Sequence, residues 1–153
     1  MKAASAEPRI IGAIQLAGIR ESVSYARSQV RGWLGSDHPV LDDVVLAVSE
    51  LVTNALRHSD ARPYDFIGLT VADEGGQVRV RVRDPGSAFS GPYIRREPDA
   101  EDGRGLLIVR EVSRDWGVQE HGRGLGRTVW CVIPVVASTA PASPGFGSRA
   151  VTS

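Results

Sequence analysis

The chain has 153 residues, of which 42% are hydrophobic, and its 18 basic and 18 acidic side chains give a formal net charge of zero. This length suits one compact domain with a buried core, and the balanced charge argues against an extended surface for nucleic acid or anionic lipid. No stretch approaches the roughly 20 apolar residues that a membrane-spanning helix needs. The single cysteine, Cys131, cannot form an internal disulfide and fits a reducing compartment. We therefore expect a cytoplasmic protein that binds neither nucleic acid nor membrane directly.

The first half of the chain is predicted to form one strand and two helices after a flexible leader at residues 1–8. Residues 10–18 are typical of a short strand, and residues 20–35 place apolar side chains three or four positions apart, as an amphipathic helix does. The strongest helical pattern covers residues 39–59, where apolar side chains gather on one broad face. The opposite face of this helix carries the polar side chains of Asp43, Glu50, Asn54 and Arg57.

A hairpin follows over residues 65–84, with its turn at "EGG" and a strictly alternating second strand, "QVRVRVR". Alternation predicts that the valines face the core and that Arg79, Arg81 and Arg83 face outward. These arginines fit a solvated sheet face or, as the alternative, a patch that binds a partner.

The second half begins with a long polar segment, residues 85–103, whose length is typical of a functional lid or a disordered loop. A helix at residues 104–113 and strands at 115–121 and 127–136 are expected next, and residues 137–153 have the composition of a disordered tail. Hairpins join most of the strands. The predicted fold class is therefore α/β, a two-layer α/β sandwich with a mostly antiparallel sheet and its helices on one face.

Glu50 and Asn54 are the first candidates for chemistry, because residues four apart on a helix share one face. A carboxylate can act as a general base, and an amide oxygen can ligate Mg²⁺ without adding charge. Arg57 and His58, one turn further on, lie within reach of an anion. The alternative is an ordinary solvated helix face with a cation near its C-terminal end.

Two later positions can contact a ligand through side chains. Asp84 ends a strand and can accept a hydrogen bond from an exocyclic amine such as that of adenine, while Gly86 permits tight backbone geometry beside it. Thr128 begins the last strand, where its hydroxyl can join Asp84 in recognising a base. Both positions also have structural explanations, since an Asp-Pro-Gly turn needs no ligand and threonine is common in strands.

The segment "GRGLLIV" can bind phosphate through its backbone. Gly103 and Gly105 leave backbone N–H groups available to a ligand where a helix begins, and Arg104 can add a guanidinium. No lysine and Ser/Thr follow a glycine loop, which excludes a P-loop, and the third glycine of a dinucleotide-binding motif is replaced by Ile108. Leu106, Leu107 and Val109 are expected to supply core side chains to this helix.

Together, "SELVTNALRH", "DPG" at a strand end, a long lid, "GRGL" and "GRTVW" resemble the ATP-binding domain of the GHKL superfamily, the Bergerat or histidine-kinase-like ATPase fold. The resemblance covers residues 9–136, which we expect to be the ATP-binding domain. Within the superfamily the chain is similar to the small anti-sigma-factor serine/threonine kinases. Gyrase, mismatch-repair and heat-shock ATPases need further domains, and none of the three histidines, His38, His58 and His121, lies in a histidine-kinase phospho-acceptor setting.

The resemblance implies ATP and Mg²⁺ as cofactors and assigns roles to the candidate residues. Glu50 would be the catalytic base and Asn54 the Mg²⁺ ligand, and the remaining residues would contact the nucleotide. These are Asp84, Gly86, Gly103, Arg104, Gly105, Leu106 and Thr128, and we extend the same role to Arg57 and His58 beyond the matched motifs. The family's second motif commonly has a further glycine where this chain has Ala88, which alters the loop around the nucleotide.

The implied function is transfer of phosphate to a serine or threonine of an anti-sigma-factor antagonist, with the same body able to sequester a sigma factor. A homodimer is left open. The first alternative is a non-catalytic nucleotide-sensing binding module, which the change to Ala88 favours. The second alternative is a relic of the fold that binds no nucleotide.

Overall fold

The computed structural model describes residues 7–58, 65–85, 107–122 and 124–135. Its elements are β1 (Arg9–Ala17), α1 (Glu21–Leu34), α2 (Leu41–His58), β2 (Phe66–Asp73), β3 (Gln77–Arg83), β4 (Asp115–Glu120) and β5 (Arg127–Pro134). Residues 107–112 are also helical. Most of the predicted leader and the whole predicted tail lie outside the described residues, as does most of the predicted lid.

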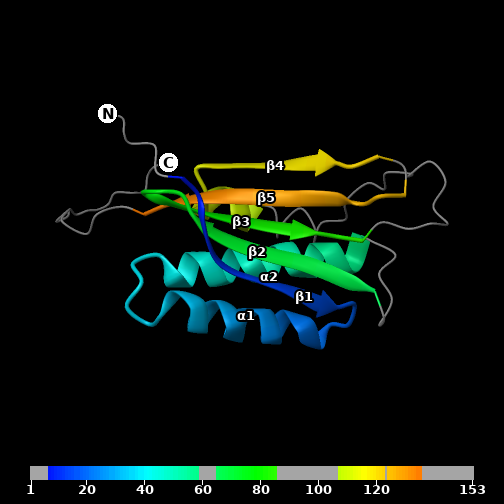
Figure 1. Cartoon of the computed structure of the whole chain (residues 1–153), viewed down its shortest axis with the longest axis horizontal. Coiled ribbons are helices and arrows are strands. Elements are labelled where there is room, and N and C mark those ends of the chain that lie inside the picture. Colours follow the sequence, from blue (N-terminus) through cyan, green and yellow to red (C-terminus); the bar gives the residue numbers. More distant parts are fainter. Residues whose placement is uncertain (1–6, 59–64, 86–106, 123, 136–153) are drawn as a thin grey trace.

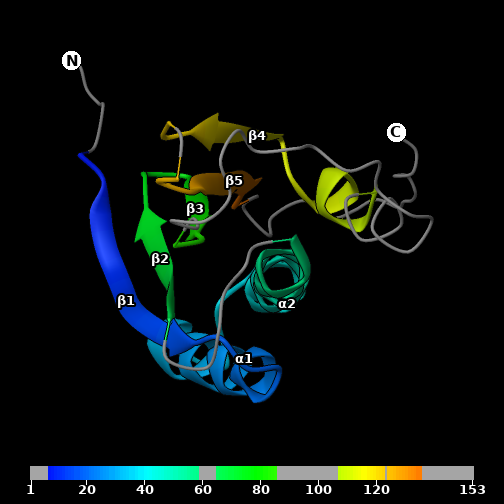
Figure 2. The ribbon, with the colours of Figure 1, turned by 90° about the vertical axis from the view of Figure 1, so that its right-hand side faces the viewer.

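The five strands form one sheet in the order β1-β2-β3-β5-β4, and every neighbouring pair is antiparallel. Both long helices pack on the same face of the sheet, with α2 against its centre and α1 beside α2 (Figure 1, Figure 2). The predicted two-layer α/β sandwich is confirmed. No helix in the described part of the chain is long and apolar enough to cross a membrane.

The core lies between α2 and the sheet, where the sequence periodicities meet. On α2, Val44, Val48, Leu51 and Val52 are completely buried. The facing side chains come from alternate positions of the central strands, namely Ile67, Leu69, Val71, Val78, Val80, Val82, Cys131 and Ile133. A helix stripe with a period near 3.6 and strands with a period of 2 thus bury the same apolar layer.

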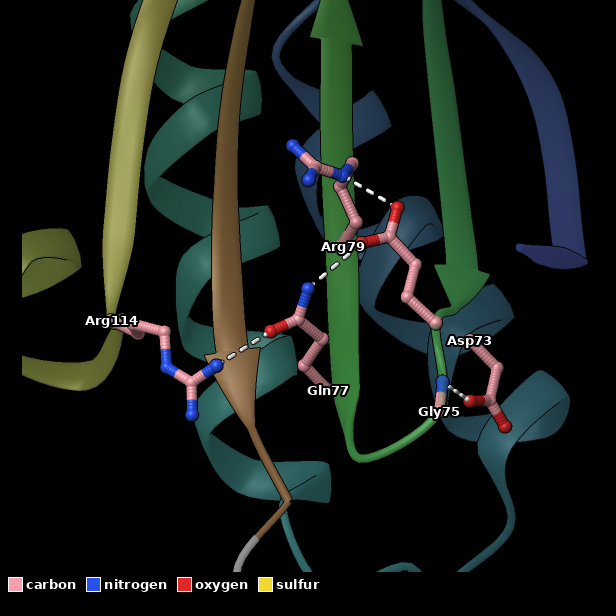
Figure 3. Close-up of polar contacts among 6 residues, drawn as sticks. Asp73, Gly75, Gln77, Arg79 and Arg114 are labelled. Atoms are coloured by element: carbon pink, nitrogen blue, oxygen red, sulfur yellow. Dashed lines mark hydrogen bonds and ion pairs between the residues drawn. The ribbon is translucent and has the colours of Figure 1, made fainter. Parts of the chain in front are cut away.

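The hairpin between β2 and β3 is fixed by a short polar network, drawn in Figure 3. Gly75 and Gly76 adopt positive φ angles of 68° and 90°, and the Gly75 N–H donates to Asp73 Oδ1 over 2.9 Å. Glu74 accepts from Arg79 Nε at 2.6 Å and from Gln77 Nε2 at 2.9 Å, and the hydrogen bond from Arg79 lowers the pKa of the Glu74 carboxyl. These contacts hold Arg79 against the surface of its own hairpin.

The outer face of the sheet carries the three arginines that alternation predicts. Arg79 lies over the ring of Trp130 at 5.0 Å, and Arg83 Nη2 donates to the Leu125 carbonyl at 3.3 Å, whereas Arg81 is exposed. Two of the three guanidinium groups are therefore engaged with the protein itself. This favours a structural sheet face over a dedicated partner-binding patch.

We expect Gly12→Ala to destabilise the protein by about 1–3 kcal/mol, because a methyl group there overpacks the core edge. A Cβ on Gly12 would collide with the ring of Trp33, which packs against the core. Urea denaturation would measure the change. Gly32→Ala is the matched control, since nothing lies within 4 Å of its Cβ position in α1 and alanine should stabilise a helix there by about 0.5–1 kcal/mol. Equal midpoints for Gly12→Ala and wild type would contradict the expectation.

Cys131 should be unreactive in the folded protein. Its side chain is completely buried, and burial raises its pKa from the ordinary 9.0 to about 12. We expect alkylation of the Cys131 thiol at pH 8 to be about a thousandfold slower in the folded protein than in urea, because only the thiolate attacks. The Cys131 thiol of the unfolded protein ionises at a lower pH than that of the folded protein. This thiol should therefore also reduce the free energy of unfolding as pH rises from about 9 to about 12. Labelling at the urea rate without denaturant would refute the buried placement.

Candidate functional site

The polar flank of α2 is the first part of the site. Glu50 and Asn54 are half-buried, and Arg57 at the end of the same flank is exposed. Asp43, also half-buried, begins the flank, and the pKa of its carboxyl is raised by burial and by the neighbouring Asp42. The predicted separation of apolar and polar faces on this helix is thus present, with Glu50 and Asn54 one turn apart at the margin of the core.

Contacts with α1 and the sheet fix the position of this helix. Arg27 Nη1 of α1 donates to Ser49 Oγ at 3.3 Å, immediately before Glu50 in the chain. On the other side, α2 packs through completely buried side chains against β2, β3 and β5. Glu50 and Asn54 therefore project from a helix that is fixed by its packing. Residues that take part in chemistry need such a fixed position.

Asp84 is the second part of the site and lies where β3 ends. Its N–H donates to the Arg127 carbonyl at 3.0 Å, which extends the β3–β5 pairing by one residue. By alternation its side chain falls on the same face as Val82, the face that α2 covers. Its carboxylate is only 9% exposed, and Oδ2 lies 3.6 Å from Arg127 Nε. A buried carboxylate needs such a partner, because an unpaired charge is costly away from water.

Thr128 lies at the same end of the sheet, but its register places it on the other face. It pairs with Arg83, so its side chain points away from the face of Asp84. Its hydroxyl is buried and is 2.7 Å from His121 Nε2. The structure therefore brings Arg127, not the Thr128 hydroxyl, to the Asp84 carboxylate. A nucleotide-contacting role for Thr128 stays a prediction.

Arg127 is the residue that the sequence patterns did not single out. The signal for it was present, since strict alternation in "RTVWCVIP" puts Arg127 on the face of Val129 and Cys131. Only the pairing of β3 with β5, however, shows that this face position lies beside Asp84.

The third part of the predicted site falls largely outside the described residues. Gly86, Ala88, Gly103, Arg104, Gly105 and Leu106 lie there, and so does the side chain of His58. The helical residues 107–112 lie on the same side of the sheet as α2 (Figure 2), and Val109 is completely buried in the core.

The core role predicted for Leu107 is wrong, because its side chain is 54% exposed. On a helix, two residues differ by about 200° in direction, so Leu107 points away from the face on which Val109 is buried. The apolar face of this segment instead continues to Val112, which packs against the core three residues later.

The side chains on the helix-covered side fit a nucleotide with its metal. Asn54 offers an amide oxygen of the kind that Mg²⁺ accepts alongside phosphate oxygens. Glu50 offers a half-buried carboxylate on the same flank, and Asp84 offers a buried acceptor at a strand end. A half-buried carboxylate such as that of Glu50 can support proton abstraction, and a buried acceptor such as Asp84 can recognise an amine-bearing base.

Comparisons with known proteins agree with this fold. The family model described as the histidine kinase-like ATPase domain matches residues 17–133. The anti-sigma F factor of Clostridium acetobutylicum is 29% identical over 115 residues, which cover 68% of this chain and 80% of that protein. The crystal structure of the RsbU and RsbW domains of Rv1364c from Mycobacterium tuberculosis matches with a TM-score of 0.60 and 27% identity. That match covers 85% of this chain and 33% of the solved chain, so this chain spans about a third of its length.

Proposed function

This chain belongs to the histidine kinase-like ATPase domain family, and we propose that it is an ATP-binding regulator that transfers phosphate to a serine or threonine of an anti-sigma-factor antagonist. The resemblance to the GHKL superfamily and its anti-sigma-factor branch is confirmed by the family match and by the two relatives. One observation carries the proposal. Glu50 and Asn54 lie together on the polar flank of α2, and α2 lies on the side of the sheet to which Asp84 points.

The candidate residues on α2 and at the end of β3 have separate roles in the proposed reaction. Asn54 would hold Mg²⁺ through its amide oxygen, and Asp84 would accept a hydrogen bond from the adenine amine. Glu50 would accept the proton of the substrate hydroxyl as that oxygen attacks phosphorus. When bound, ATP would supply the γ-phosphoryl group and leave as ADP as its bond to the bridging oxygen breaks, and Mg²⁺ would offset the negative charge on the phosphates. Arg57 and His58, at the end of α2, are candidates to contact the phosphates.

The remaining assignments rest on the resemblance and on the relatives. The backbone of residues 103–105 would close over the phosphates, with Leu106 and Gly86 beside the nucleotide. The partners would be an antagonist protein and a sigma factor, since one relative bears the name anti-sigma F factor. We also propose that the protein acts in the cytoplasm and that residues 9–136 form its ATP-binding domain. This domain can form a homodimer.

Two measurements on the whole chain test this function. Equilibrium binding of ATP with and without Mg²⁺ asks whether the fold holds its nucleotide, and transfer of label from γ-labelled ATP to antagonist proteins encoded nearby asks whether it is a kinase. Binding with transfer supports the proposal. Mg²⁺-dependent binding without transfer to any antagonist would replace the kinase with a nucleotide-sensing module, and absence of binding would leave a relic of the fold.

A further inference from the structure

The ion pair between Asp84 and Arg127 places a hydrogen-bond donor beside a hydrogen-bond acceptor on the face of the sheet that α2 covers, which we call the site face. Asp84 Oδ2 and Arg127 Nε are 3.6 Å apart, and the two side chains are only 9% and 19% exposed. The backbones are tied as well, since the Asp84 N–H donates to the Arg127 carbonyl. Register places Glu120 of β4 opposite Arg127, on the same face. The guanidinium is therefore set between two carboxylate-bearing positions.

The chemistry of this pair matches one edge of adenine. An ionised carboxylate only accepts hydrogen bonds, and a guanidinium only donates them. The edge of adenine that carries its amine presents the N6 amine as a donor directly beside N1 as an acceptor. A guanidinium has five N–H donors in a rigid fork, so one arginine can face a carboxylate and a base nitrogen at the same time.

We propose that Arg127 is a specificity-determining residue that donates a hydrogen bond to N1 of adenine while Asp84 accepts from the N6 amine. The inference rests on the proposed ATP binding and adds a residue to it. Thr128, the residue predicted to assist Asp84, has its side chain on the other face of the sheet with His121. On the site face, Arg127 is the first residue of β5 and can donate hydrogen bonds to a base.

The test is a cycle between the protein and the ligand, with ATP and 1-deaza-ATP as probes. In 1-deaza-ATP a C–H group replaces N1, so the acceptor is lost while the ring shape and the amine remain. Wild type should bind ATP about tenfold more tightly than 1-deaza-ATP, as expected for loss of a hydrogen bond to a charged donor. Arg127→Met, which removes the donors and keeps an apolar stem, should bind the two nucleotides with equal affinity.

The controls separate this role from a structural one. A purely structural arginine would change both affinities together, since folding effects cancel in the ratio. Arg83→Met, a neighbouring position on the opposite face, should keep the tenfold preference. Wild type that binds ATP and 1-deaza-ATP equally would overturn the inference without any variant, and so would a preference that survives in Arg127→Met. Equal affinities of wild type for ATP and 1-deaza-ATP refute only the role of Arg127, whereas absence of ATP binding to wild type refutes the proposed function as well.

Discussion

Glu50→Gln should reduce phosphate transfer to the antagonist by about 10²- to 10⁴-fold while leaving the affinity for Mg·ATP within about twofold of wild type. The substitution keeps the shape and helix propensity of the side chain and removes the basic carboxylate. Because Glu50 is half-buried at the margin of α2 and takes no part in the apolar core, the fold should be unaffected. Single-turnover transfer from labelled ATP measures the rate, and equilibrium titration measures the affinity.

Glu21→Gln is the matched control for that experiment. Glu21 is an exposed carboxylate in the first turn of α1, so the same chemical change occurs away from the site. Transfer by Glu21→Gln should equal that of wild type. If Glu50→Gln and Glu21→Gln transferred phosphate equally fast, Glu50 would not be the base, and the carboxylate that serves this role would have to be sought elsewhere.

The architecture could be predicted from the sequence because its elements carry strong periodic signals. The stripe on α2 and the alternation in "QVRVRVR" each bury one face, so the core follows from the pattern alone. The hairpin turn follows in the same way from Gly75 and Gly76, whose positive φ angles suit glycine. The ends of these elements lie within two residues of the predicted bounds.

The site was less predictable, because contacts between distant strands decide it. Asp84 is predictable as a site residue from its place at a strand end, but its partner Arg127 comes from a strand that begins 43 residues later. No local pattern encodes that β3 pairs with β5, or that Thr128 and Arg127 fall on opposite faces beside Asp84. Leu107 shows the same limit on a smaller scale, since a short apolar run does not reveal which of its members turns outward.

Asn54→Ala should remove the Mg²⁺ dependence of ATP binding. Wild type is expected to bind ATP at least about tenfold more tightly with Mg²⁺ than with EDTA, and the variant should bind in both conditions with the weaker affinity. The reason is that the amide oxygen of Asn54 is the proposed protein ligand on this flank, and alanine offers no oxygen in its place. Alanine is also the best helix former, so α2 should persist.

The outcome of this last experiment separates a metal ligand from a residue that only shapes the pocket. If Asn54 merely packed beside the nucleotide, the affinity would fall equally with Mg²⁺ and with EDTA, and the ratio between the two conditions would survive. Ser28→Ala on the exposed side of α1 should retain both the affinity and its Mg²⁺ dependence. Because Glu50 and Asn54 share one flank, a lost ratio in Asn54→Ala together with lost transfer in Glu50→Gln would place metal and proton chemistry on a single turn of α2.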